Sequence, residues 1–123
     1  MIGIDIVESK RIKEAEMRTP GFLEKVFTPK EIAYCQKHKD PYPRLAARFA
    51  AKEAIVKALG TGFRGINFLD IDISHNELGQ PKATLSKSPI KNKSPEELSQ
   101  NIELSLSHTK DYGTAVALIN FRP

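Results

Sequence analysis

The chain has 123 residues, of which 40% are hydrophobic and 28% charged, a composition typical of one globular domain spanning residues 1–123. Its formal net charge of +4 favours anionic partners but does not choose among them. No apolar run reaches the roughly 20 residues that span a bilayer, and Asp5 interrupts an N-terminus that lacks a basic lead-in, so we expect neither a membrane segment nor a signal peptide. One cysteine, Cys35, allows no internal disulfide, which predicts a reducing, cytoplasmic location.

The first half of the chain reads mainly as helix. Residues 1–7 alternate as a strand, whose face of Ile2, Ile4 and Ile6 we expect in the core, with Asp5 pointing away from that face. Ser9 is a candidate cap for a helix to about residue 18, which 19–21 interrupt before a short helix or turn over 22–27. The pattern Thr28-Pro29-Lys30-Glu31 predicts a capped helix ending near residue 38, and a long helix follows residues 40–43 and ends at Gly60.

The second half reads mainly as strand. Alternation predicts strands over 67–73, 82–85, about 102–107 and 114–121, with a glycine-rich loop over 61–65 and a turn over 78–81. Residues 86–101 read as a surface loop with one helical turn begun by Ser94. Early helices and late strands indicate an α+β fold, in which one long central helix packs on a small antiparallel sheet.

The long helix carries the residues of greatest chemical interest. A large-apolar stripe and a broad alanine face leave little of its circumference for water, so we expect it to be packed on two sides. Glu53 and Lys57 lie one turn apart on the seam between these faces, and Arg48 and Lys52 border the apolar stripe on the other side.

Two interpretations of Glu53 and Lys57 stay open at this point. They form an ordinary surface ion pair, or they place a carboxylate for a divalent cation and an ammonium for a phosphate in one crevice. Gly60 and Gly62 follow, and their backbone N–H groups could approach a phosphate, although Gly60 is also what an ordinary helix end requires. Asp5 is a candidate partner of Glu53 in a metal site, or a residue with a capping or hairpin role.

His108 follows Ser107 at a strand end, which raises the alternative of a serine hydrolase. No strand-turn-helix nucleophile elbow surrounds either nearby serine, so this alternative is disfavoured. His108 then reads as a turn residue or as a donor to a phosphate oxygen.

Three blocks together resemble the holo-acyl-carrier-protein synthases, the small phosphopantetheinyl transferases. They are GIDIVESKRI at residues 3–12, RFAAKEAIVKALGTG at residues 48–62 and LSHTKDY at residues 106–112. The middle block is the most specific, and the order and spacing of the three match across nearly the whole chain.

The resemblance implies a reaction, a cofactor and an assembly. The 4′-phosphopantetheine arm of coenzyme A is transferred to a serine hydroxyl of an apo acyl carrier protein, in support of fatty acid biosynthesis, and adenosine 3′,5′-bisphosphate is released. Mg²⁺ is implied at Asp5 and Glu53, because both residues match the family's metal-binding acids. The family's fold is a small α+β domain, and its small bacterial members are homotrimers with active sites between subunits.

Roles for individual residues follow from this resemblance. Glu53, Lys57 and Asp5 are the implied catalytic residues, with Glu53 taking the serine proton directly or through water. The implied coenzyme A contacts are Arg48, Lys57, Gly60, Gly62, His108, Thr109 and Arg44, with Lys52 a weaker candidate that otherwise reads as a solvated charge.

A basic patch is implied for docking the acidic carrier protein. Arg11, Arg18 and Lys25 recur every seven residues around Phe22, although residues 20–21 break any continuous helix. The spacing alone is more often that of a solvated surface.

The sequence departs from the family at two places. The turn that helps to hold the adenine end is often Asn-Gly-Lys-Pro or Asn-Gly-Arg-Pro, whereas Leu78 and Gln80 stand in it here, which bears on coenzyme A affinity. Gly113 follows Tyr112 where the family more often has alanine, a change we expect to be tolerated.

Two other functions are weighed against this one. A basic nucleic-acid-binding module would need clustered cations with stacking aromatics, and another Mg²⁺-dependent phosphotransferase would show a P-loop or kinase signature. The sequence carries neither pattern, so no nucleic acid partner is expected.

Overall fold

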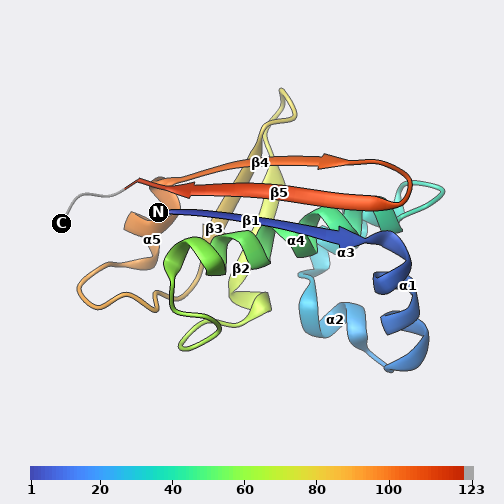
Figure 1. The fold of residues 1–123 in the computed structure, drawn as a ribbon, viewed down its shortest axis with the longest axis horizontal. Helices are drawn as coiled ribbons and strands as arrows, with labels where there is room; N and C mark the ends of the chain where they lie inside the picture. The colour runs from blue at the N-terminus through green and yellow to red at the C-terminus, as the bar shows by residue number, and fades with distance from the viewer. Residues whose placement is uncertain (121–123) are drawn as a thin grey trace.

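The computed structural model describes residues 1–120, which form one α+β unit (Figure 1). The helices are α1 (Ser9–Arg18), α2 (Phe22–Val26), α3 (Pro29–Gln36), α4 (Tyr42–Leu59), the short 3-10 helix η1 (Phe68–Asp70) and α5 (Pro95–Gln100). The strands are β1 (Ile2–Glu8), β2 (Ile71–His75), β3 (Pro81–Leu85), β4 (Ile102–His108) and β5 (Tyr112–Ile119). The predicted α+β class is confirmed.

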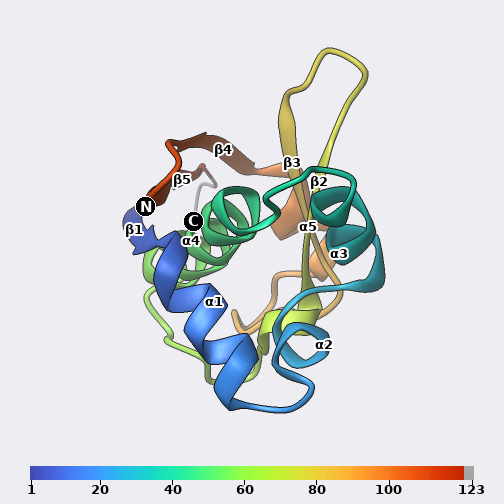
Figure 2. The ribbon, with the colours of Figure 1, turned by 90° about the vertical axis from the view of Figure 1, so that its right-hand side faces the viewer.

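Two antiparallel sheets flank α4. The order β1-β5-β4 forms one sheet, and the hairpin of β2 and β3 forms the other. Viewed from the end, the three-stranded sheet curves over one side of α4 while the hairpin and α3 lie on the opposite side (Figure 2). The long helix is therefore packed on two sides, as its sequence predicts.

Two glycines, which have no side chain, allow α4 to approach the sheet closely. A Cβ atom built on Gly3 would lie 2.0 Å from the main-chain oxygen of Ala54, and one on Gly113 would lie 2.2 Å from the main-chain nitrogen of Ala47. Glycine at position 113 is therefore accommodated, as expected, because α4 backbone occupies the space that a methyl group would need.

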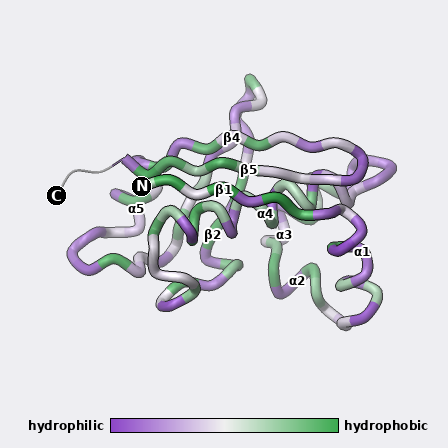
Figure 3. Tube along the Cα trace, in the orientation of Figure 1, coloured by the Kyte–Doolittle hydropathy of each residue, from purple (hydrophilic) through white to green (hydrophobic). Residues whose placement is uncertain are grey.

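The isoleucine face of β1, which we expected in the core, points to solvent instead. Ile2, Ile4 and Ile6 are 69%, 66% and 64% exposed, whereas the opposite face, with Gly3 and Val7, packs on α4. Hydropathy along β1 and the neighbouring β5 is high in Figure 3, although only one face of each strand meets the core. Asp5 does point away from the isoleucines, as predicted, and so lies on the helix side.

Local signals place most helix ends within two residues. Thr28 and Glu31 form the predicted capping box of α3, which ends at Gln36, and Gly60 ends α4 in the left-handed conformation. Ser9 is the first residue of α1 and no cap, because Glu8 occupies the cap position and its side chain makes no capping hydrogen bond.

Two strand boundaries differ from the expectations. The strand expected over 67–73 begins only at Ile71, because Asn67 and Asp70 form a reciprocal cap around η1. The last strand begins at Tyr112 and ends at Ile119, and the expected end at Phe121 lies outside the described residues. Within 86–101, Ser94 caps α5, a six-residue helix where one turn was expected.

A buried ion pair ties α4 to three other segments. The Nζ atom of Lys52 lies 2.7 Å from Oε1 of Glu31 and donates to the main-chain oxygens of Val26 and Phe68, and both charged side chains are 0% exposed. The interpretation of Lys52 as a solvated charge or phosphate ligand is therefore wrong, since three internal acceptors use its ammonium. Burial lowers the pKa of Lys52, against the raising effect of Glu31.

Candidate active site

Asp5 and Lys57 meet where β1 crosses α4. The Lys57 Nζ atom lies 2.9 Å from Oδ1 of Asp5 and 3.0 Å from the main-chain oxygen of Ile4. The Lys57 side chain remains 53% exposed, so its ammonium faces solvent as well as the carboxylate. This contact joins residues 52 positions apart, which no helical spacing could have indicated.

Glu53 lies half-buried beside this pair. Burial raises its pKa above the ordinary value, the negative charge of Asp5 raises it further, and Lys57 and Arg11 lower it. Two carboxylates and an ammonium thus share one region of the surface. Among residues 1–120, no ion pair joins Glu53 to Lys57, so the simple surface pair gives way to an Asp5–Lys57 pair with Glu53 nearby.

A second cluster lies at the other end of α4. Arg44, His108 and Thr109 line one groove of about 540 Å³, together with His38, Lys39, Asp40, Pro43 and Lys110. Burial lowers the pKa of His108, and the neighbouring charge of Arg44 lowers it further, so the imidazole is favoured in its neutral form. The groove carries the cations and neutral donors that phosphate oxygens require.

Arg48 occupies a different environment from these groove residues. It is only 2% exposed, its guanidinium lies 4.3 Å from the centre of the Tyr34 ring, and its Nη2 atom lies 3.0 Å from Nδ1 of His75. Burial lowers the pKa of His75, as does Arg48, so Nδ1 acts as the acceptor. The sequence offered no signal for His75, because its partner lies 27 residues away; the coenzyme A contact of Arg48 stays a prediction.

Both glycines of the loop after α4 adopt left-handed backbone conformations. The φ angles are +75° at Gly60 and +61° at Gly62, and no heavy atom lies within 4 Å of a Cβ built on either. Conformation rather than crowding therefore selects glycine here. Both residues are exposed, but the N–H of Gly60 donates to the main-chain oxygens of Val56 and Lys57 and is not free for a phosphate.

The two clusters lie at opposite edges of the three-stranded sheet. Asp5 belongs to the edge strand β1 and His108 to the other edge strand, β4, with β5 between them. Arg44 and Lys57 are also about 20 Å apart along the α4 axis, at 1.5 Å per residue. Within one chain, α4 and the sheet thus separate the acidic cluster, which consists of Asp5 and Glu53 beside Lys57, from the basic groove lined by Arg44, His108 and Thr109.

The predicted docking residues lie on α1 and α2. Arg11 and Arg18 are exposed on α1; Arg11 lies 6.0 Å from the centre of the Phe49 ring, and Arg18 pairs with Glu14 at 4.0 Å. Phe22 packs partly against the core, whereas Lys25 borders an apolar groove of about 690 Å³ beside Phe63, Phe68 and Leu69.

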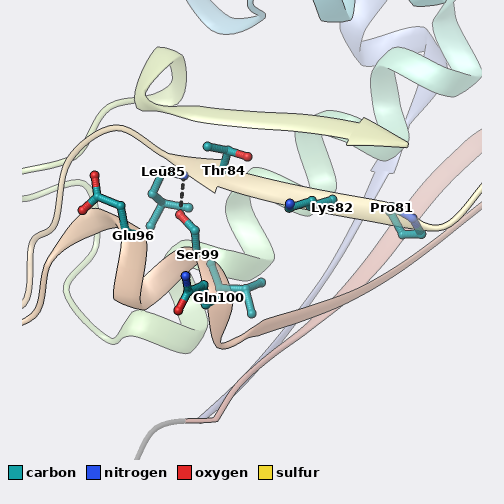
Figure 4. A pocket seen from close by; sticks show the side chains of 8 residues that line it. Pro81, Lys82, Thr84, Leu85, Glu96, Ser99 and Gln100 are labelled. Atoms are coloured by element: carbon teal, nitrogen blue, oxygen red, sulfur yellow. Dashed lines mark hydrogen bonds between the residues drawn. The ribbon is translucent and has the colours of Figure 1, made fainter. Parts of the chain in front are cut away.

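Another groove, of about 480 Å³, lies between β3 and α5 and contains none of the predicted site residues. Figure 4 shows Lys82 and Thr84 on the strand, with Glu96 and Gln100 on the opposite helix. The hydroxyl of Ser99 there accepts a 2.8 Å hydrogen bond from the main-chain nitrogen of Leu85 and donates to the main-chain oxygen of Pro95. The Ser99 hydroxyl thus joins α5 to β3.

Comparison with known proteins identifies the family. The sequence profile of the 4′-phosphopantetheinyl transferase superfamily matches residues 1–117. This chain belongs to the 4′-phosphopantetheinyl transferase superfamily. The resemblance seen in the three sequence blocks is confirmed.

Individual superfamily members agree in sequence and in structure. The chain is 46% identical over 117 residues to a holo-[acyl-carrier-protein] synthase of Caldanaerobacter subterraneus subsp. tengcongensis, covering 95% of this chain and 91% of the relative. It is 44% identical over 118 residues to the synthase of Clostridium tetani, covering 96% and 93%. The Helicobacter pylori synthase solved in complex with coenzyme A superposes with a TM-score of 0.80 at 36% identity, covering 98% of this chain and all of that one.

Membership of the phosphopantetheinyl transferase superfamily selects among the functions that the sequence left open. Neither a nucleic-acid-binding module nor an unrelated phosphotransferase accounts for a match that extends over almost the whole chain. Among residues 1–120, no helix has the length and apolar character needed to cross a membrane.

Proposed function

We propose that this chain transfers the 4′-phosphopantetheine arm of coenzyme A to a serine hydroxyl of an apo acyl carrier protein. The serine oxygen forms a bond to the phosphorus that bears the pantetheine arm, and the pyrophosphate bond to the adenosine part breaks. Adenosine 3′,5′-bisphosphate leaves with the electrons of that bond. The observation that carries the proposal is the grouping of Asp5, Glu53 and Lys57 in a chain of this superfamily.

The carboxylates of Asp5 and Glu53 fit a divalent cation such as Mg²⁺. Both donors are oxygens, and Mg²⁺ binds proteins through one or two carboxylates while keeping waters and substrate oxygens as its other ligands. The proximity that lets Asp5 raise the pKa of Glu53 also lets both acids reach one ion. Among residues 1–120, no set of three acidic, histidine or cysteine side chains forms a metal cage. When bound, the cation supplies positive charge to the pyrophosphate oxygens.

The chain's own residues supply positioning, charge and a proton acceptor. Lys57 is exposed enough to contact a phosphate, and Asp5 holds its ammonium toward β1. Glu53 accepts the serine proton, directly or through a water molecule, from its half-buried position beside Asp5 and Lys57. Phosphoryl-type transfer depends mainly on such positioning and charge neutralisation.

The basic groove suits the adenosine and phosphate end of coenzyme A. Arg44 supplies a permanent cation, while His108 and Thr109 supply hydrogen-bonding groups at the turn between β4 and β5. Gly62 stays a candidate to offer its backbone N–H, whereas the N–H of Gly60 already donates within α4. The turn with Leu78 and Gln80 lacks the usual cation. We therefore expect weaker binding of the adenine end than in relatives that have a lysine or arginine in this turn.

Separation of the acidic and basic clusters favours an active site shared between subunits. Within one chain the two clusters are about 20 Å apart along α4, whereas a neighbouring copy could present its basic groove next to the acidic cluster. The exposed side chains of Ile2, Ile4, Ile6 and Leu118, with the half-buried Val116, offer an apolar contact surface for such copies. We assign this face to the homotrimer that the family resemblance implies.

The acceptor protein docks through the basic face of α1 and α2 in this proposal. Arg11, Arg18 and Lys25 are exposed there, and Arg11 lies close enough to Glu53 to lower its pKa. An acidic carrier would thus be attracted to the side of the chain that bears the acidic cluster. We place the reaction in the cytoplasm, in support of fatty acid biosynthesis, because the free, buried Cys35 suits a reducing compartment.

Intact-mass spectrometry of an apo acyl carrier protein tests the reaction directly. Incubation with this chain, coenzyme A and Mg²⁺ should add one phosphopantetheine to the carrier, and EDTA should abolish the gain. No gain on any of several carriers, from a folded chain that still binds coenzyme A, would overturn the proposed acceptor class. Loss of coenzyme A binding as well would overturn the proposed substrate.

A further inference from the structure

We infer that the N-terminus of α1 forms a binding site for a phosphate monoester, in a groove that adjoins the one containing Arg44 and His108. The site is a groove of about 460 Å³ lined by residues from three regions of the chain. Its cations are Lys10 and Lys13 on α1, Lys39 before α4, and Lys110 in the turn between β4 and β5.

Ser9 shows that this groove offers more than surface lysines. Ser9 lines the groove and is only 7% exposed, and its Oγ atom is buried without a hydrogen-bond partner among residues 1–120. A buried hydroxyl normally has a partner, because burying it unpaired costs free energy. A phosphate oxygen can accept a hydrogen bond from it once the groove is filled.

The start of α1 adds a second source of positive potential. No acidic residue lies in the first turn of this ten-residue helix, and Glu8 makes no side-chain capping bond. The Ser9 N–H donates to the main-chain oxygen of Asp111 at 2.8 Å, while the N–H groups that follow have no acceptor within the helix. Helix N-termini attract anions through these free amides and the helix dipole.

Acidic residues of the chain neutralise only a small part of the positive charge in this groove. Lys10 lies 3.7 Å from the exposed Glu14, and Lys13 lies 5.9 Å from the centre of the Tyr42 ring. Asp40 and Asp111 also line the groove, but Oδ1 of Asp40 accepts a hydrogen bond from the main-chain nitrogen of Tyr42. In the described part of the chain, Lys13, Lys39 and Lys110 form no ion pair. The groove thus contains four cations, two acids and one hydroxyl without a partner. This set suits a dianion that has several acceptor oxygens.

Two sources could supply this phosphate chemistry. The groove shares Lys39, Asp40 and Lys110 with the neighbouring groove of Arg44 and His108, so a phosphate monoester on a molecule held next door could reach it. A free phosphate monoester could also bind alone. The site stands on its own geometry in either case and does not depend on the proposed transfer reaction.

Titration of the ¹⁵N-labelled full chain with inorganic phosphate, at constant ionic strength set with NaCl, tests the site. We expect saturable shifts confined to the amides around Ser9, Lys10, Lys13, Lys39 and Lys110. Ser9→Ala and Lys13→Gln should each weaken binding at least about fivefold, because each removes a donor to a charged ligand. Lys87→Gln removes the same charge from an exposed loop position and should leave the affinity unchanged.

A second pair of titrations identifies the source of the phosphate. If coenzyme A displaces inorganic phosphate and dephospho-coenzyme A does not, the 3′-phosphate of the substrate occupies the site. If phosphate still binds to the chain saturated with coenzyme A, a free phosphate monoester is the ligand. Shifts that do not saturate, that spread over all surface lysines, or that persist unchanged in folded Ser9→Ala and Lys13→Gln would overturn the site.

Discussion

Lys57 pairs with Asp5 across 52 positions of the chain, although Glu53 lies one helical turn away on the same helix. The 2.9 Å contact between Nζ and Oδ1 leaves the Glu53 carboxylate without an ion-pair partner among residues 1–120. Glu53 is therefore available to bind a cation or to accept a proton, while Asp5 fixes the position of the ammonium.

Replacement of Glu53 should abolish most activity without unfolding the chain. Glu53→Gln removes the negative charge and the proton acceptor, and we expect kcat to fall by about 10²- to 10⁴-fold. The half-buried side chain makes no ion pair within residues 1–120, so the melting temperature should stay near that of the wild type. Glu96→Gln, an exposed change on α5, is the matched control. Full activity of Glu53→Gln would exclude Glu53 from catalysis.

A charge on the isoleucine face of β1 should disrupt assembly. Ile4→Glu places a carboxylate in the middle of the exposed apolar face, where contact between copies would have to desolvate it. Light scattering after size-exclusion chromatography should show the mass of three chains for the wild type and of one chain for the variant. Met17→Glu, at a 77% exposed position on α1, should keep the wild-type mass. A monomeric wild-type chain would contradict the assignment of this face.

Breaking the buried pair of Lys52 and Glu31 with a single substitution should strongly lower the stability of the chain. Lys52→Met leaves the Glu31 carboxylate buried without its cation, which we expect to lower the free energy of unfolding by about 3–5 kcal/mol. Glu31→Gln should also destabilise the chain, and the double variant should lose less than the sum of the two. Urea denaturation of all four proteins measures this coupling. Simple additivity would show that the pair acts as two independent groups.

The hydroxyl of Tyr42 should titrate at unusually high pH. Its hydroxyl donates a hydrogen bond to Oε1 of Glu16, and this bond, with burial and nearby acids, raises the pKa of Tyr42 to about 12. Because the folded-state pKa is the higher one, this stabilisation is complete below the unfolded value of about 10 and is lost as the pH rises toward 12.

Phenolate absorbance can be followed cleanly, because the chain has three tyrosines and no tryptophan. Tyr42→Phe should remove the latest transition, and Glu16→Gln should shift it to lower pH. Tyr112→Phe, a change at an exposed tyrosine, should leave the latest transition in place. An unchanged last transition in Tyr42→Phe would assign the raised pKa to another residue.

Local sequence signals placed most of the elements in this protein. The Thr28–Glu31 box and Gly60 act through backbone groups within a few residues, so the limits of α3 and α4 follow from neighbours in the chain. The three sequence blocks likewise identified the superfamily, since each block keeps its chemistry-bearing residues at fixed spacing.

Packing between distant segments decided what these signals could not. Alternation along β1 defines two faces, but Gly3 and Gly113 let α4 cover the face opposite the isoleucines. The helical wheel placed Lys52 at a border, whereas Glu31 and two main-chain oxygens from other segments allowed its complete burial. Residue patterns predicted most of the elements, the family and the candidate residues. The partners of Asp5 and Lys52 emerged only in the folded chain, because burial and ion pairing depend on residues that folding brings together.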